Sequence, residues 1–528
     1  LVLKGDNRFS GPTNVAAGVL GIGGAGTMTS GNAANIYTSA ISIANGATFK
    51  FANTDGDSQS FTGVISGGGA LIKDGNSEMT LNANNTFTGG TTVDGGTLWL
   101  GRGGNVGTIR GVLTVNAGGT VDYAADHTFG WDAGQSIHTL NIVGGTVGGA
   151  AHAQHFYGGG TFNLNMTGGE LKLGKPANYG FNPVGTLNVT SNAVADGDPI
   201  ALISAATSGG SFTLDRTATF NTLGDLEISA TIDRRGTNAP TVVKTGDAEL
   251  ILSGANIYPG ATQVRDGTLR IATTGSLASP GSNAYGGTIR IDGGAAIVNE
   301  SSIAQLWTGA ISGTGNLTHT GSGQLTLQAN SSFTGNTTIG VTGSGAAASV
   351  LQVGNGGGTG YIAGDVFIHE TSTLQYFRTN TSAISVGHSL SGPGTLRLQS
   401  TNNVNNTGSY QFRVASPNFT GDTVIEAGAR MHLMHASGLG QTTNGVKPGK
   451  IKVLDDGQLM IDVPTGVVTN DLELKGIGWK ENVGQLGALR MIRGEFTGDI
   501  LLTGDARIGA WIRQDGTISG VISDGANN

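Results

Sequence analysis

The chain has 528 residues, of which 93 are glycine and none is cysteine, and its formal net charge is −8. Without cysteine it holds neither a disulfide framework nor a thiolate metal site, and the weak acidic balance argues against nucleic acid as the main partner. Charged residues make up only 12% of the chain, and no apolar run approaches the roughly 18 residues of a membrane-spanning helix.

Short stretches in which apolar and polar residues alternate run along the whole chain. In 96–100, Leu98 and Leu100 belong to one face and Trp99 to the other, and a period of two is typical of a strand with one buried face. The same alternation recurs at 171–173, 269–271, 289–291, 396–398 and 451–453. Glycine, Asn-Gly and Asp-Gly separate these stretches and supply the positive φ of tight corners. Because no stretch has a sustained helical period, the sequence predicts an all-β fold.

The spacing of the turns leaves the architecture open, since turns every ~8–12 residues also suit a sandwich or a propeller. The length of the chain without a domain break favours a solenoid, in which each coil contacts only its neighbours. We therefore predict a single long parallel β-helix, or β-solenoid, with about 22 residues per coil.

The sequence also contains a second repeat with a period longer than one strand. One phrase has an aromatic residue, a glycine two positions later and a threonine two positions after that, and its copies are mostly about 75 to 86 residues apart. A glycine-rich phrase precedes it at 63–69, 309–315 and 391–394, and a degenerate copy lies at 168–174. The structural anchors of the five clear copies are Phe9, Gly11, Thr13, Phe87, Gly89, Thr91, Tyr258, Gly260, Thr262, Phe333, Gly335, Thr337, Phe419, Gly421 and Thr423.

These phrases resemble the autotransporter-associated β-strand repeat of bacterial passenger domains. The resemblance is specific at the five aromatic copies and extends in patches over most of the chain. It implies a right-handed parallel β-helix displayed outside the cell, on the outer surface of a bacterium.

The repeats also divide the chain. We expect residues 1–528 to form one continuous β-solenoid, with repeat blocks at approximately 1–62, 63–140, 141–240 (degenerate), 241–308, 309–385 and 386–519, and with 520–528 as the start of the next block. The chain begins inside one phrase and ends inside another. We therefore expect it to be a window from a longer repetitive chain, whose open strand edges need a cover.

Two histidine pairs are the first candidates for chemistry. His152 and His155 lie in a loop-like stretch and could converge on a metal, whereas His432 and His435 are an odd number apart and would point to opposite faces of a strand. Solvated polar residues are the favoured interpretation of both pairs.

Acidic residues are the second candidates. Asn53, Asp55 and Asp57 have the spacing of a calcium loop, but position 64 is valine where such a loop has glutamate, and an Asx-rich turn is favoured. The adjacent Asp455 and Asp456 would face opposite sides of a strand and make a poor acid–base pair. We assign no catalytic residue, no metal and no cofactor, and we expect no enzyme activity.

Basic residues often occupy the outward position of the predicted strands. They suggest a ladder for an acidic polysaccharide, but lysine and arginine also keep exposed strands soluble, and this second interpretation is favoured. The positions are Lys172, Arg270, Arg290, Arg397, Lys452 and Arg490.

Possible surface contacts are Trp99 and a cluster of Arg507, Trp511 and Arg513. An outward tryptophan between arginines could stack on a sugar or insert into a partner. Packing under a loop or against an adjacent molecule is an equal alternative.

The sequence thus predicts a non-enzymatic extracellular structural or surface-display protein, a rigid stalk of autotransporter-passenger or adhesin type. The alternative is a self-assembling subunit of an extracellular filament or sheet, and a weaker one is a polysaccharide-acting β-helix enzyme. The expected partners are copies of the chain itself, end to end or side by side, or a cell-surface glycan or protein, and not nucleic acid.

Overall fold

The computed structural model describes residues 1–31, 35–132, 134–149, 152–175, 181–207, 209–277, 281, 283–343, 347–379, 383–401, 409–481, 484–511 and 515–525, and for 155–159, 181–184 and 481 the backbone alone. Two compact units are present, Leu1–Arg270 with Gly275–Pro280, and Ile271–Thr274 with Gly281–Asn528. Both are all-β, and the described residues contain no helix. Accordingly, these residues hold no helix that is long and apolar enough to cross a membrane.

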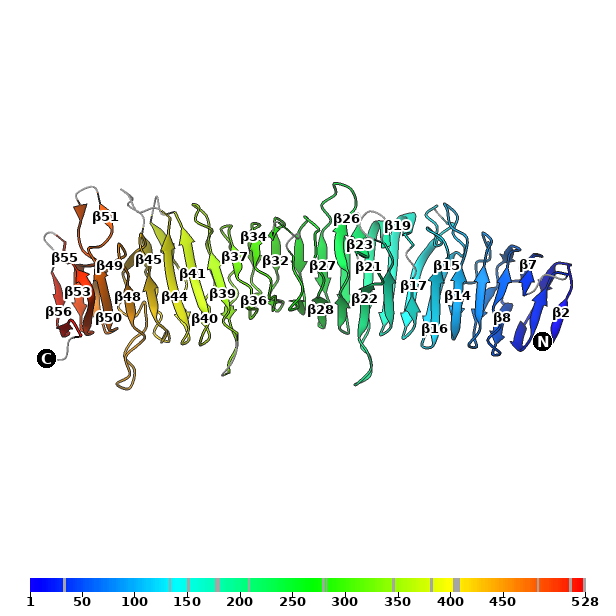
Figure 1. Ribbon diagram of the computed structural model, residues 1–528, viewed down its shortest axis with the longest axis horizontal. Coiled ribbons are helices and arrows are strands. Elements are labelled where there is room, and N and C mark those ends of the chain that lie inside the picture. Colours follow the sequence, from blue (N-terminus) through cyan, green and yellow to red (C-terminus); the bar gives the residue numbers. More distant parts are fainter. Residues whose placement is uncertain are drawn as a thin grey trace. The chain divides into compact units, whose positions relative to one another are not determined.

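Within each unit, successive coils of the chain stack so that each strand pairs with the strand one coil later (Figure 1). The named strand pairs are parallel except for one short hairpin, in which β51 (Lys480–Glu481) pairs with β52 (Gly484–Gln485). The predicted fold class, an all-β parallel solenoid, is therefore confirmed. The boundaries of the repeat blocks stay a prediction.

The first unit has two long runs of strands. One run contains β1 (Val2–Leu3), β4 (Val19–Gly24), β8 (Thr48–Asn53), β11 (Ala70–Lys73), β13 (Thr91–Val93), β15 (Gly111–Asn116), β17 (Ile137–Val143), β19 (Gln154–Thr167), β21 (Phe181–Ser191), β24 (Ala218–Thr222), β27 (Val242–Thr245) and β29 (Thr262–Val264). The other contains β6 (Ile36–Tyr37), β9 (Gln59–Phe61), β12 (Glu78–Leu81), β14 (Gly96–Leu100), β16 (Gly119–Tyr123), β18 (Thr146–Val147), β20 (Glu170–Leu173), β22 (Ala201–Ala205), β25 (Leu226–Ile228) and β28 (Glu249–Leu252).

Shorter strand groups complete this unit. They are β3 (Thr13–Val15) with β7 (Ile41–Ile43) and β10 (Ile65–Gly67), β2 (Asp6–Arg8) with β5 (Thr27–Thr29), and β23 (Ser211–Leu214) with β26 (Thr231–Arg234). The strand β30 (Thr268–Ile271) lies at the division between the units.

The second unit has four runs. The longest contains β31 (Ala284–Tyr285), β34 (Gln305–Trp307), β37 (Leu325–Leu327), β39 (Val350–Val353), β41 (Thr373–Arg378), β44 (Thr395–Ser400), β46 (Thr423–Ile425), β48 (Ile451–Val453), β50 (Leu472–Gly476), β54 (Ile500–Ala506) and β57 (Ile522–Ser523). The others are β33 (Ala296–Asn299), β36 (Asn316–His319), β38 (Thr337–Ile339), β40 (Val366–Ile368) and β43 (Leu390–Ser391); β32 (Ile289–Ile291) and β35 (Ile311–Gly313); and β42 (Ile384–Val386), β45 (Tyr410–Phe412), β47 (Arg430–Leu433), β49 (Gln458–Val468), β53 (Leu489–Phe496), β55 (Ile508–Ala510) and β56 (Gly516–Ile518).

The interior of each unit is a column of inward side chains. Met79, Leu98 and Val121 occupy the same register position on β12, β14 and β16, and all three are fully buried. Burial of an aliphatic side chain of this size contributes roughly 1.5–3 kcal/mol. Alternation along each strand therefore builds the core, and each register position gains one inward side chain per coil.

The aromatic and glycine-rich phrases of the sequence meet in the structure. Gly89 donates its N–H to the carbonyl of Gly69 one coil earlier, over 3.1 Å. A methyl group on Gly335 would collide with the carbonyl oxygen of Gly315. In both cases the glycine of the aromatic phrase lies against the glycine-rich phrase of the preceding coil, which explains why the two phrases occur together.

The aromatic anchors fill the core beside these contacts. Phe87, Tyr258, Phe333 and Phe419 are at most 1% exposed, whereas Phe9, in the first copy, is 37% exposed. The anchor threonines Thr91, Thr262, Thr337 and Thr423 are also buried, while Thr13 is half-buried.

Buried amides tie one coil to the next. The Asn85 side chain accepts the N–H of Ile65 (2.8 Å) and donates to the carbonyl of Thr108 (2.9 Å). Asn256 bonds Ile232 and Ser276 in the same way, at 2.9 and 3.0 Å. Each amide thus bonds a backbone N–H of the coil before it and a backbone carbonyl of the coil after it. These bonds help to satisfy backbone groups around the ends of the short strands.

Two lysines are buried at inward strand positions. The ammonium of Lys73 donates to the carbonyls of Asp74 (2.8 Å), Gly75 (2.9 Å) and Gly95 (2.8 Å). Lys244 makes the equivalent three contacts, with the carbonyls of Thr245, Gly246 and Asp266 at 3.1, 2.6 and 3.0 Å. Both side chains are 0% exposed, and burial lowers the pKa of each lysine to about 8.

We predict that Gly335→Ala lowers the free energy of unfolding by about 1–3 kcal/mol, because the added methyl group must push two coils apart. The matched control is Gly11→Ala in the first copy of the same phrase, where a methyl group would meet nothing within 4 Å and the change should stay within about 0.5 kcal/mol. Denaturant unfolding of both variants checks this. Equal losses in the two variants would contradict it.

We also predict that Lys244→Met destabilises the first unit by about 2 kcal/mol or more, because the three carbonyls around the buried ammonium lose their donor. Lys172→Met is the control, since Lys172 is part of an exposed ion pair with Glu170 at 3.3 Å, and such pairs contribute little. Hydrogen–deuterium exchange around residues 242–266 should increase in the first variant only. Unchanged exchange there would show that the three carbonyls do not depend on the ammonium.

Candidate functional site

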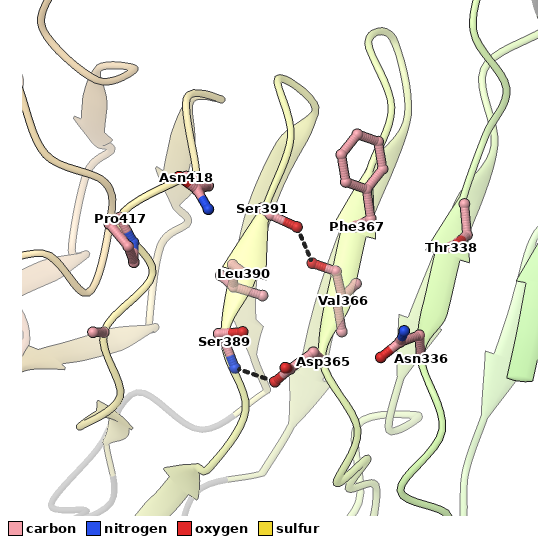
Figure 2. A pocket seen from close by; sticks show the side chains of 11 residues that line it. Asn336, Thr338, Asp365, Val366, Phe367, Ser389, Leu390, Ser391, Pro417 and Asn418 are labelled. Carbon is pink, nitrogen blue, oxygen red and sulfur yellow. Dashed lines mark hydrogen bonds between the residues drawn. The ribbon is translucent and has the colours of Figure 1, made fainter. Parts of the chain in front are cut away.

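A surface hollow of about 410 Å³ lies on the second unit, across the strands β38, β40 and β43 and the segment 415–418 (Figure 2). Successive coils contribute one wall position each, because Thr338, Phe367 and Ser391 share a register. The hollow is therefore built by coil stacking and not by a single loop.

Phe367 stands on the outward face of β40. Its neighbours in the strand, Val366 and Ile368, are buried at 1% and 0%, while Phe367 is 39% exposed. The side chains on either side of it along the sheet, Thr338 and Ser391, are small, so the ring is not flanked by bulky neighbours from the adjacent coils. One edge contact holds the ring, with His369 at 4.7 Å between ring centroids.

Polar groups line the hollow beside the ring. The Asp365 carboxylate accepts the N–H of Ser389 at 2.9 Å with one oxygen, Oδ1. Within the described part of the chain, its other oxygen and the side-chain amides of Asn336 and Asn418 make no hydrogen bond or ion pair. These groups are therefore available to bond solvent or a ligand in the hollow.

A buried histidine precedes two of the lining residues in the chain. His388 is 3% exposed and precedes the lining residues Ser389 and Leu390 in the chain. Its Nδ1 lies 3.2 Å from the carbonyl of Ile362, which only accepts, so Nδ1 carries the proton and Nε2 accepts the Tyr376 hydroxyl at 3.0 Å. Burial lowers the pKa of His388 to about 4, so the ring is neutral at physiological pH.

We predict that His388 makes the second unit acid-sensitive. Its folded pKa of about 4 lies below the unfolded value of about 6.5, so its contribution is fully present above pH 6.5 and is lost as the pH falls toward 4, up to about 3 kcal/mol. His388→Gln should flatten the pH dependence of the unfolding free energy in this window. His435→Gln, at an exposed position, should leave it unchanged. Identical slopes for His388→Gln and the parent chain would contradict the prediction.

Charge at the predicted outward positions is largely neutralised. Five of the six basic residues form an ion pair with a carboxylate: Lys172–Glu170 (3.3 Å), Arg270–Glu249 (2.5 Å), Arg290–Asp292 (2.6 Å), Arg397–Glu426 (3.4 Å) and Lys452–Asp422 (2.8 Å). The expectation that Arg490 lies in solvent is wrong: it is 6% exposed, and its guanidinium lies 4.1 Å from the centroid of the Trp511 ring. The tryptophan covers it.

The predicted surface contacts are not gathered in one place. Trp99 is half-buried on β14, in the first unit. Trp511 is 42% exposed over Arg490, and Arg507 donates to the carbonyl of Gln485 at 2.5 Å. Arg513 lies outside the described residues.

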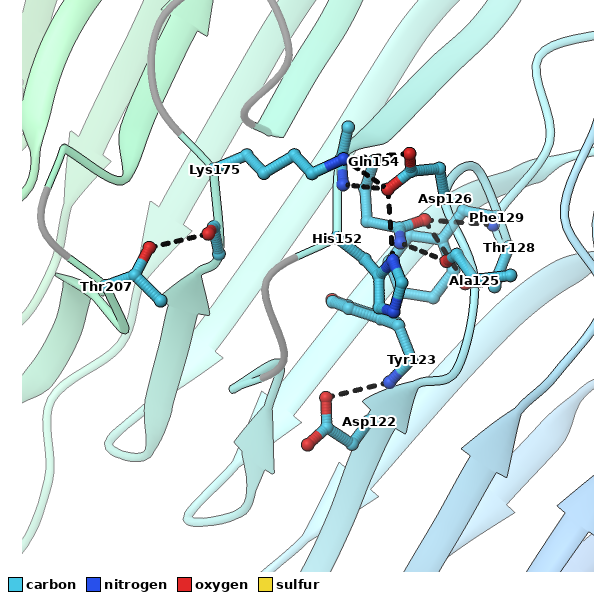
Figure 3. A network of polar contacts seen from close by, with 12 residues as sticks. Asp122, Tyr123, Ala125, Asp126, Thr128, Phe129, His152, Gln154, Lys175 and Thr207 are labelled. Atoms are coloured by element: carbon cyan, nitrogen blue, oxygen red, sulfur yellow. Dashed lines mark hydrogen bonds and ion pairs between the residues drawn. The ribbon is translucent and has the colours of Figure 1, made fainter.

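A polar network in the first unit joins three coils (Figure 3). The Asp126 carboxylate contacts the Lys175 ammonium (2.9 Å), His152 Nδ1 (3.1 Å) and the N–H of Ala153 (2.8 Å). Burial alone would raise the pKa of Asp126, but the hydrogen bonds from Lys175, Ala153 and His152 hold it at about 2. The network thus links successive coils through one carboxylate. The side chain of His155, the second member of this histidine pair, lies outside the described residues.

The other histidine and carboxylate candidates from the sequence make contacts that do not bring them together in one site. His432 pairs with Asp462 at 3.4 Å, whereas His435 accepts the N–H of its own neighbour Ser437 at 3.2 Å. In the first unit, Asn53 accepts the N–H of Asp55 at 3.0 Å and forms an Asx turn. No group of three or more histidine, aspartate or glutamate side chains in the described ranges is placed to hold a metal ion.

Comparison with known proteins agrees with this architecture. A family model described as "Passenger-associated-transport-repeat" matches residues 1–22, 71–100, 242–271, 317–340 and 391–429. Each matched segment contains one of the aromatic anchors, from Phe9 to Phe419. The chain is an autotransporter-passenger-type β-helical repeat protein. Proteins of this kind are secreted or displayed at the cell surface.

One curated relative supports the same assignment of this passenger-type chain. "Adhesin BmaC autotransporter" of Brucella suis biovar 1 (strain 1330) is 32% identical over 187 residues, which cover 32% of this chain and 5% of the relative. The chain thus corresponds to a small part of that protein's length. No solved structure matches the chain.

Sequence reasoning missed two features of this passenger-type chain. The alternation Val366-Phe367-Ile368 signals an outward aromatic, but its exposure depends on the neighbours that the coil register supplies. The buried lysines Lys73 and Lys244 fall at the same position of two matched segments, and an alignment of the segments would have revealed them.

Proposed function

We propose that the chain is a non-enzymatic stalk of an adhesin-type passenger on the outer surface of a bacterium, and that it presents binding surfaces away from the cell. The observation that carries the proposal is the coincidence of passenger-associated transport repeats with coils joined by parallel backbone ladders. Such coils contact only their neighbours, so adding coils extends the stalk without changing its construction.

The printed name of the relative supports the adhesive part of the proposal, since it describes an adhesin. The engagement of the candidate carboxylates supports the non-enzymatic part. Asp455 pairs with Lys475 at 2.9 Å, and Asp456 accepts a hydrogen bond from Gln485 at 3.0 Å. Both residues are thereby used in joining neighbouring segments of the chain.

The test compares bacteria that export the natural full-length protein with an isogenic strain whose protein lacks residues 1–528. We expect the parent strain to adhere to host or neighbouring cells several-fold better than the deletion strain. External protease should remove the segment from intact parent cells, and antibody labelling of the remaining protein controls for its display. Equal adherence of the two displayed forms would contradict the adhesive function.

A second measurement addresses catalysis. The purified chain is incubated with polysaccharides and with unfolded protein, and the release of reducing sugar ends and peptides is followed over time. We expect no release above the buffer control. Turnover that is abolished by Asp455→Asn or Asp126→Asn would identify an enzyme instead.

A further inference from the structure

We propose that the hollow around Phe367 binds an uncharged saccharide. The inference rests on the proposed function, because it would make this surface an adhesive element of the stalk. Its basis is the combination of an exposed aromatic ring in the lining, hydrogen-bonding groups beside it, and the absence of a cation from the lining residues.

The aromatic ring provides a flat apolar surface in a polar hollow. Phe367 is 39% exposed, and Thr338 and Ser391, its neighbours along the sheet, are too short to cover it. The apolar C–H face of a pyranose can stack there, as aromatic rings do with other amphipathic groups. The volume of about 410 Å³ lies in the range of about 300–1,000 Å³ that is usual for small-molecule sites.

The polar groups suit hydroxyls, which both donate and accept. The amides of Asn336 and Asn418 offer donors and acceptors, and the outer oxygen of Asp365 accepts. Asp365 is already fixed by the Ser389 N–H at 2.9 Å, so little conformational freedom is lost when it bonds a ligand. The aromatic ring therefore suits the apolar face of a sugar, and the polar groups beside it suit the hydroxyls around the sugar's edge.

Charge decides between neutral and acidic saccharides. Asp365 is the one ionisable residue in the lining, and no lysine or arginine accompanies it. Arg397 and Lys452, on other strands of this unit, are paired with carboxylates. A polyanion would meet a negative charge without compensation, so an acidic saccharide is disfavoured relative to a neutral one.

The experiment uses the purified chain and four probes: maltohexaose, galactan and mannan as neutral saccharides, and polygalacturonate as the acidic one. Isothermal titration and saturation-transfer NMR measure binding. We expect at least one neutral probe to bind and Phe367→Ala to weaken it about three- to tenfold, with Asn336→Ala and Asn418→Ala also weakening it. Leu454→Ala is the control, because Leu454 is 40% exposed in the same unit and lies outside the lining.

A second variant guards against an indirect effect of truncation. Ser391→Tyr would place a ring beside Phe367 and cover its open face, so it should abolish binding while leaving the melting temperature of the chain unchanged. The inference is overturned if no neutral probe binds, if only polygalacturonate binds, or if Phe367→Ala binds as tightly as the parent chain.

The adherence assay separates this inference from the proposed function. If deletion of residues 1–528 abolishes adherence but neutral saccharides do not bind, the saccharide site is wrong and the adhesin-type stalk stands. If saccharides bind through Phe367 but deletion leaves adherence unchanged, the site stands and the adhesive function is wrong.

Discussion

Backbone hydrogen bonds between adjacent coils hold neighbouring strands about 4.8 Å apart, and this spacing restricts which residue can stand at each position. Where two coil corners meet, as at Gly335 against Gly315, there is no room for a methyl group. Where a strand ends early, a side chain must replace the missing backbone partner, as Asn85 and Asn256 do. The phrases repeat along the chain because their copies make the same few contacts between adjacent coils.

The same spacing shapes the outer surface. Side chains at one register position lie next to those of the coils before and after, so the exposure of a residue depends on its neighbours' size as much as on its own. Phe367 is open because Thr338 and Ser391 are short, whereas Arg490 is closed because Trp511 lies over it. A binding surface on a solenoid can thus arise from small residues that flank a large one.

The sequence predicts the strands and the all-β solenoid well, because alternation within a strand is a local property. Leu98 and Leu100 are buried and Trp99 faces outward, as their order indicates. The hollow could not be predicted, since 29 residues separate Thr338 from Phe367 but only 24 separate Phe367 from Ser391, and loops of unequal length hide the register. Lys73 was missed for another reason: a charged residue is expected outside, and only the carbonyls of two coils explain its inward position.

The lysine contacts bear on how coils find their correct alignment. Lys73 and Lys244 each donate to two carbonyls of their own turn and to one carbonyl of the next coil. If the next coil docked two residues out of place, every side chain would keep its face, because the side-chain period of a strand is two residues, but the ammonium would lose that carbonyl while remaining in the interior. An aliphatic core tolerates such a slip far better, because leucine and valine are nearly interchangeable as neighbours. The buried charges therefore favour the native register of adjacent coils over a shifted one.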